Sequence, residues 1–266
     1  MTALAAARQI FGLFATLGRK TGKTRVFAIL GLIPIALGIG ARVVLHGRTG
    51  LMADVSTEIL MAFFLQFYIV ILSLFFGTSV AAEEIENRTL AYLITRPVPK
   101  GSIVLGKYAA YSALMFAMVG TSLTVSYVII NAGRLGEAAV YGTFFRYLAV
   151  LGLGILAYTA FFTFLGVLLK RSIIVGLIFG FGWEMAIQFF PGSTQRFSIV
   201  HFLKSLLPFH PAPSGLASGG RGVALLLFRL EPTSPGLAIL ALVLITAAFL
   251  GLAAWLFRTK EYLYED

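Results

Sequence analysis

Six long apolar segments constrain the fold of this chain more than any other feature. Each is about as long as an α-helix must be to cross the hydrocarbon core of a bilayer, and the strands of a membrane β-barrel would be about half that length. Within the segments, charge is confined to Arg42 and Lys107 near segment ends and to Glu184 inside the fifth. The sequence therefore predicts an all-α membrane protein, a single transmembrane domain over 1–266 with six transmembrane helices, at residues 26–45, 59–82, 103–130, 147–169, 172–190 and 236–257.

The composition excludes an ordinary soluble domain. Hydrophobic residues make up 59% of the 266 residues and charged residues only 12%, about half the usual ~25% of a soluble domain. A net charge of +10 in a soluble protein would suggest nucleic-acid binding. Here the basic residues lie mainly beside the apolar segments, so we expect no nucleic-acid partner. The chain has no cysteine, which excludes disulfides and thiolate sites.

The basic residues also predict an orientation in the membrane. With the N-terminus in the cytoplasm, 13 of the 21 Lys and Arg residues lie inside and eight outside, four of those eight in one long loop where the bias counts less. We therefore expect a multi-pass protein of the cell (plasma or inner) membrane with both termini cytoplasmic.

Two segments outside the spans are expected to be partly helical. Residues 1–25 should form a cytoplasmic elbow whose apolar spacing over 3–18 favours a helix in the membrane interface, although a weakly helical tail is the alternative. Residues 191–235 should form an external, helical, re-entrant region before the sixth span, with a short amphipathic helix at 197–207.

The stretch at 83–102, between the second and third spans, carries a density of charge that the chain otherwise avoids. Glu83, Glu84 and Glu86 are followed by Arg88 and an apolar stripe that includes Leu90 and Leu93. Arg96-Pro97 disfavours further helix, so the segment reads as a short amphipathic helix at the cytoplasmic surface. Its apolar stripe suggests a docking face, and an ordinary solvated loop is the alternative.

This stretch resembles the permease subunit of ABC-2 type transporters. The similar residues are Glu84, Glu86, Thr89, Leu90, Arg96, Pro97, Val98, Lys100, Leu105, Gly106 and Lys107, although Arg88 stands where the family usually has Gly. The resemblance implies six spans, cytoplasmic termini and an elbow helix. It also implies an exporter in which two permeases, identical or different, work with two copies of a cytoplasmic ABC ATP-binding subunit.

On the same resemblance, this chain is not an enzyme and holds no cofactor, because ATP and Mg²⁺ are bound by the partner subunit. The partner would dock on the loop between the second and third spans. The residues assigned to that interface are Glu83, Glu84, Glu86, Arg88, Thr89, Leu90, Leu93, Arg96 and Pro97.

Two other functions remain open at this stage. Glu83-Glu84-x-x-x-Arg88 and Phe197-x-x-x-His201 are similar to motifs of CAAX-type intramembrane proteases. The predicted topology separates them by about 30 Å of bilayer, whereas such a site needs them together. The second alternative is an ATP-independent, ion-coupled membrane protein in which Glu184 binds a proton. The three histidines are scattered, so we expect no metal site.

Glu184 is the acid inside a predicted span, where a charge is costly and usually functional. It follows Gly176 and Gly180 at four-residue steps, which places all three on one helix face and permits close helix approach. That face could line the translocation path or the seam between two permeases. Alternatively, the carboxylate could reach the outer interface or be held by Gln188 or a nearby hydroxyl.

Overall fold

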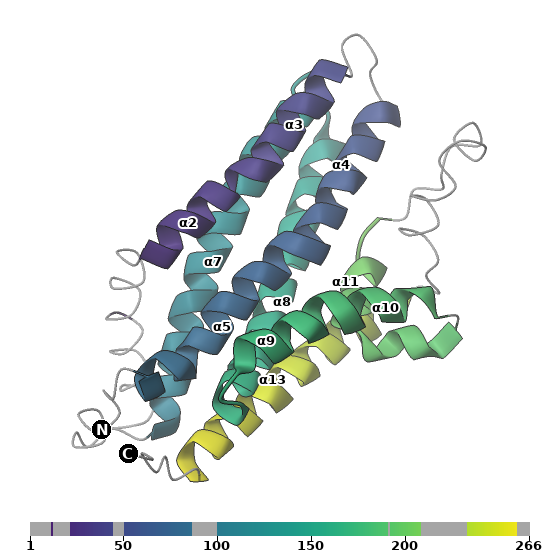
Figure 1. Cartoon of the computed structure of the whole chain (residues 1–266). Coiled ribbons are helices and arrows are strands. Elements are labelled where there is room, and N and C mark those ends of the chain that lie inside the picture. Colours follow the sequence, from purple (N-terminus) through teal and green to yellow (C-terminus); the bar gives the residue numbers. More distant parts are fainter. Residues whose placement is uncertain are drawn as a thin grey trace.

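The computed structural model is a bundle of long helices (Figure 1). It describes residues 12, 22–44, 51–86, 100–190, 192–208 and 233–259. No strand occurs among these residues, so the predicted all-α class is confirmed for the described part of the chain. The long elements are α2 (Gly22–Leu30), α3 (Leu32–Val44), α4 (Leu51–Phe63), η1 (Phe64–Tyr68), α5 (Ile69–Glu86), α7 (Lys100–Ile130), α8 (Ala138–Leu168) and α13 (Pro235–Thr259).

Five helical stretches are long and apolar enough to cross a membrane. They correspond to the first, second, third, fourth and sixth predicted spans, and they run over Thr24–Val43, Ser56–Val80, Gly101–Ile130, Ala138–Leu168 and Pro235–Thr259. The largest difference in bounds is at the fourth, which begins at Ala138 instead of residue 147. The α-helix tolerates Arg146 because this side chain is exposed on the surface of α8.

The segment predicted as the fifth span is built differently. Its apolar helix, Ser172–Ala186, is shorter than the other five. It contains four short pieces in direct succession, so its helical turns extend from Ser172 to Phe189, and the six-span layout stays a prediction at this point. The pieces are α9 (Ser172–Leu177), the π-helix η2 (Ile178–Trp183), α10 (Glu184–Ala186) and the 3₁₀-helix η3 (Ile187–Phe189).

Helix α8 lies at the centre and packs against α5 on one side and α13 on another (Figure 1). The α5–α8 contact is close because glycines stand where the backbones meet. A Cβ on Gly166 would lie 2.8 Å from the Thr78 carbonyl oxygen, and one on Gly77 would lie 2.8 Å from Phe162 Cβ. Small residues allow this close packing in a membrane, where the hydrophobic effect does not drive helix association.

Two short helices follow the fifth segment and fold back against the bundle. They are η4 (Gly192–Phe197) and α11 (Ile199–Ser205), and α11 packs on α8 and α13. Leu203 of α11 is fully buried and sits over Gly154, whose missing side chain makes room for it. A short helix at this place agrees with the expectation of helical structure at 197–207. The elbow at 1–25 lies almost wholly outside the described residues.

Candidate functional site

The residues predicted to dock an ATP-binding subunit are described only in part. Glu83, Glu84 and Glu86 form the C-terminal end of α5, which continues through Glu86. The other six (Arg88, Thr89, Leu90, Leu93, Arg96 and Pro97) lie outside the described residues. The docking assignment therefore stays a prediction.

Gly176, Gly180 and Glu184 share one buried face, which meets α5 and α8 of the same chain. A Cβ on Gly176 would collide with Leu74 Cδ1, and one on Gly180 would lie 2.7 Å from Val70 Cγ1. The expected close approach is therefore used within the chain. The assignment of this face to a translocation path or a permease seam stays a prediction.

The π-helix η2 helps to keep these residues on one face. In an α-helix, four residues exceed one turn of 3.6 residues, so a four-residue repeat drifts around the axis. A π-helix has wider turns with i→i+5 hydrogen bonds, so the same four residues fall short of a turn. Since η2 spans Ile178–Trp183, between Gly176 and Glu184, its wider turns offset the drift. Glu184 consequently points into the protein.

The Glu184 carboxylate binds the N-terminus of α11. It accepts a hydrogen bond from the Ser198 hydroxyl, and it also accepts from the backbone N–H groups of Ile199 at 3.1 Å and Val200 at 3.3 Å. The first N–H groups of a helix have no partner within the helix, and a carboxylate there satisfies them and interacts favourably with the helix dipole. Ser198 occupies the N-cap position without capping the helix itself. The acid 14 residues earlier takes over that function.

A second polar group beside Glu184 is centred on Gln188. Its side-chain oxygen accepts from Lys204 Nζ at 2.6 Å and from Gln66 Nε2 at 3.2 Å, while its Nε2 donates to the Glu184 carbonyl oxygen at 2.7 Å. These bonds join α11 and η1 to the fifth segment. Burial lowers the pKa of Lys204 to about 8, although the charge of Glu184 acts in the opposite direction.

Two further buried polar side chains complete this cluster. Tyr158 is fully buried on α8 and interacts electrostatically with Glu184, but its hydroxyl makes no hydrogen bond of normal geometry to any residue that the structure describes. His201 Nε2 lies 3.0 Å from Thr233 Oγ1, and the Thr233 N–H donates to Ser205 Oγ at 3.2 Å. Burial lowers the pKa of His201, and Arg196 lowers it further. Helix α11 is thus tied to Glu184 at its start and to the residues before α13 at its end.

The arrangement makes Glu184 an anchor for α11. Each acceptor oxygen of its carboxylate already receives at least one hydrogen bond from the start of that helix. The sequence left open whether a nearby hydroxyl holds the Glu184 carboxylate. The hydrogen bond from the Ser198 hydroxyl agrees with that alternative. Sequence reasoning did not single out Ser198, Lys204 or Gln66. The available signal was a Ser directly before a short apolar run, which is a helix-start pattern.

Comparison with known families decides what kind of protein carries this cluster. The family model described as "ABC-2 family transporter protein" matches residues 8–262, which is nearly the whole chain. The chain belongs to the ABC-2 transporter family. The comparison with curated proteins gives no match. The predicted family is therefore confirmed. The family model matches far more of the chain than the stretch at 83–107 that carried the resemblance.

Membership also fixes the broad class of the molecule. ABC-2 permeases are membrane components of transporters, they are not themselves enzymes, and they normally work with an ATP-binding subunit. Together with the long apolar helices, this makes the chain a multi-pass membrane protein. The protease-like motifs at 83–88 and 197–201 consequently have no support from the family.

Proposed function

We propose that this ABC-2 transporter protein is the permease subunit of an ATP-driven exporter. In this proposal it forms the translocation path and couples to a separate cytoplasmic ATP-binding subunit through residues 83–97. The observation that carries the proposal is the family match over 8–262, combined with five membrane-length apolar helices.

The position of three acids at the end of α5 supports the docking role. Glu83, Glu84 and Glu86 lie at the C-terminal end of the helix, whose last turn holds no basic residue. The three acids give this part of the chain a local negative charge, and a basic surface on a partner protein would complement it. Charges at such an interface mainly set specificity and the rate of association.

The remaining parts of the proposal concern the assembly. Two permease copies, the same or different, pair with two ATP-binding subunits, which bind ATP and Mg²⁺. Closure of the ATP-binding pair then moves the helix bundles as rigid bodies. Glu184 contributes by holding α11 against the bundle beside the predicted outer mouth of the path. Gly176 and Gly180 contribute by letting the fifth segment pack closely on α5 and α8.

Co-purification tests the docking role directly. The tagged chain is purified from its native membranes, and an associated ABC ATPase is identified by mass spectrometry. We expect the double variants Glu86→Lys with Arg88→Glu, and Leu90→Asp with Leu93→Asp, to lose this partner while they still fold. The matched control is Glu137→Lys, because Glu137 is 53% exposed at the opposite end of the bundle. Retention of the ATPase by both double variants would refute the docking assignment.

A further inference from the structure

Two π-helices meet inside the bundle, one in the second span and one in the fifth segment. In η1 the Ile69 N–H donates to the Phe64 carbonyl oxygen, which lies five residues earlier. In η2 the Glu184 N–H donates in the same way to the Phe179 carbonyl oxygen. π-Helices are rare and occur frequently at functional sites. Their occurrence in two neighbouring membrane segments indicates a common role.

Side-chain contacts join the two π-helices directly. The ring centroids of Phe67 in η1 and Phe181 in η2 lie 5.9 Å apart. Gln66 of η1 donates from Nε2 to Gln188 Oε1 at 3.2 Å, so η1 also contacts the helical turns that follow η2. The wide turns of the two segments are therefore at one level of the bundle. A bend of the second span at η1 would fall where the fifth segment is irregular as well.

The second span is packed differently on the two sides of η1. After η1, most side chains over 69–80 of α5 are buried, and none in this described stretch is exposed. Before η1, helix α4 is buried along one face, at Thr57, Leu60 and Met61, whereas Ile59 on another face is 51% exposed. Helices kink at π-turns. Since α5 is held by its neighbours and α4 is not enclosed, η1 separates a fixed part of the span from a loosely packed part.

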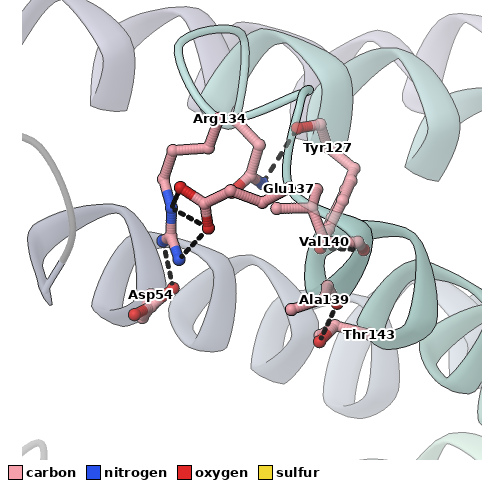
Figure 2. Close-up of polar contacts among 8 residues, drawn as sticks. Asp54, Tyr127, Arg134, Glu137, Ala139, Val140 and Thr143 are labelled. Atoms are coloured by element: carbon pink, nitrogen blue, oxygen red, sulfur yellow. Dashed lines mark hydrogen bonds and ion pairs between the residues drawn. The ribbon is translucent and has the colours of Figure 1, made fainter.

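An ion pair fastens the first turn of α4 to the turn between α7 and α8. Asp54 Oδ1 accepts from Arg134 Nη1 at 2.8 Å, and Arg134 Nη2 donates to Glu137 Oε2 at 3.2 Å (Figure 2). The side chains of Asp54 and Arg134 are 40% and 24% exposed. An ion pair this accessible to water contributes little to stability. It can therefore break and form again during a conformational change.

A cavity of about 130 Å³ lies beside this ion pair, between α4 and the adjoining ends of α7 and α8. Its wall includes Asp54 and Thr57 from α4, Tyr127 and Asn131 from the end of α7 and the turn after it, and Tyr147 from α8. Protein interiors contain few voids larger than a water molecule. The packing of α4 is therefore incomplete at this end, which leaves the helix room to move.

We propose that η1 and η2 form a hinge about which α4 swings relative to α5, and that the Asp54–Arg134 ion pair is the latch that holds α4 in place. With the latch broken, α4 moves away from the α7–α8 turn while α5 stays packed on α8. As a gating motion on the outer side, this swing rests on the proposed transport function. The hinge itself belongs to this chain alone. It is tested without ATP, so its failure would leave the docking assignment unaffected.

Spin-label distances in the full chain, with one copy per nanodisc, test the latch. The cysteine-free sequence allows labels at Ile59→Cys on α4 and Phe145→Cys on α8, which are exposed positions. We expect Asp54→Asn to increase the population of longer distances about 1.5- to 5-fold. The matched control is Glu137→Gln, which removes an acid from Arg134 without changing α4 and should leave the distances unchanged.

Two further measurements locate the motion. Labels at Leu156→Cys on α8 and Val243→Cys on α13, both exposed, report on two helices that pack together, and their distance should not respond to Asp54→Asn. Deleting Phe67, which is 39% exposed, tests the hinge. A π-turn holds about one residue more than an α-turn, so the deletion should give a regular helix in which α4 and α5 keep their faces. In this shortened chain, Asp54→Asn should no longer increase the longer distances.

Hydrogen–deuterium exchange of the unmodified chain tests the hinge without any variant, and it decides the matter if the shortened chain does not fold. We expect the peptide over 64–70 to exchange about tenfold faster than the peptide over 73–80. Equal exchange of the two peptides would overturn the proposal. So would equal effects of Asp54→Asn and Glu137→Gln, an equal change in the α8–α13 distance, or an undiminished effect of Asp54→Asn after deletion of Phe67.

Discussion

Replacing Glu184 should loosen α11 without unfolding the bundle. In Glu184→Gln, one of the two acceptor oxygens becomes an NH₂ group, which can only donate. Whichever way the amide turns, either the Ile199 N–H or the Val200 N–H loses its acceptor, because the two bond to different oxygens of Glu184. The site is 3% exposed, so water does not replace the lost partner. One unpaired buried donor costs about 1–3 kcal/mol.

Hydrogen–deuterium exchange measures this cost locally. Amides of α11 exchange when the helix opens, and each 1.4 kcal/mol corresponds to a factor of ten in the opening equilibrium. We therefore expect exchange of the peptide over 199–205 to accelerate by about 5- to 100-fold in Glu184→Gln, and by more in Glu184→Ala, which leaves both N–H groups unpaired. Exchange over 150–165 of α8 should not change.

The matched control for this experiment is Glu137→Gln, the same substitution at an exposed acid far from α11. If α11 exchanged at the same rate in Glu184→Ala as in the unmodified chain, the carboxylate would not be its anchor. If α8 accelerated equally, the effect would be a global loss of stability, and the capping argument would be wrong.

Three further predictions follow from the packing, the electrostatics and the topology. Gly166→Ala should lower the thermal unfolding midpoint in detergent, because the new Cβ would lie 2.8 Å from the backbone oxygen of Thr78. The control is Gly142→Ala on the same helix, whose Cβ would meet nothing within 4 Å and which should leave the midpoint unchanged or raise it slightly. Burial lowers the pKa of Lys204 to about 8, so between about pH 8 and 10.5 the unfolded chain holds a proton on this amine that the folded chain has lost. The free energy of unfolding should therefore rise with pH in this window, and Lys204→Met should lack that rise. In this cysteine-free chain, a Cys at Gly136 should react with an impermeant maleimide in intact cells and a Cys at Gly101 should not; the reverse result would invert the predicted orientation.

Apolar length was enough to locate most of the helices from the sequence. Five predicted spans coincide with membrane-length helices, because bilayer thickness imposes a minimum length that hydropathy reports directly. Helix α8 begins nine residues before the predicted span at 147–169, because an exposed helix face can carry a charge such as Arg146. The π-helix η2 could not be predicted either, since its six residues are too few to distinguish one helical period from another.

The candidate site was predictable only in its central residue. Glu184 stands out because an acid within an apolar run is rare, but two of its partners are backbone N–H groups, which every residue except proline possesses. Contacts such as Gln66 with Gln188 join residues 122 positions apart, so no local pattern reveals them.

The bond between Glu184 and α11 has a consequence for biosynthesis. When residues 172–190 emerge from the ribosome, the carboxylate has no partner, because its donors lie 14 to 16 residues further along the chain. An acid within an apolar segment opposes release into lipid. We therefore expect the segment and α11 to enter the membrane together as one hairpin, after residue 200 has been translated. Truncated nascent chains that end before and after this residue should differ in how completely the segment integrates.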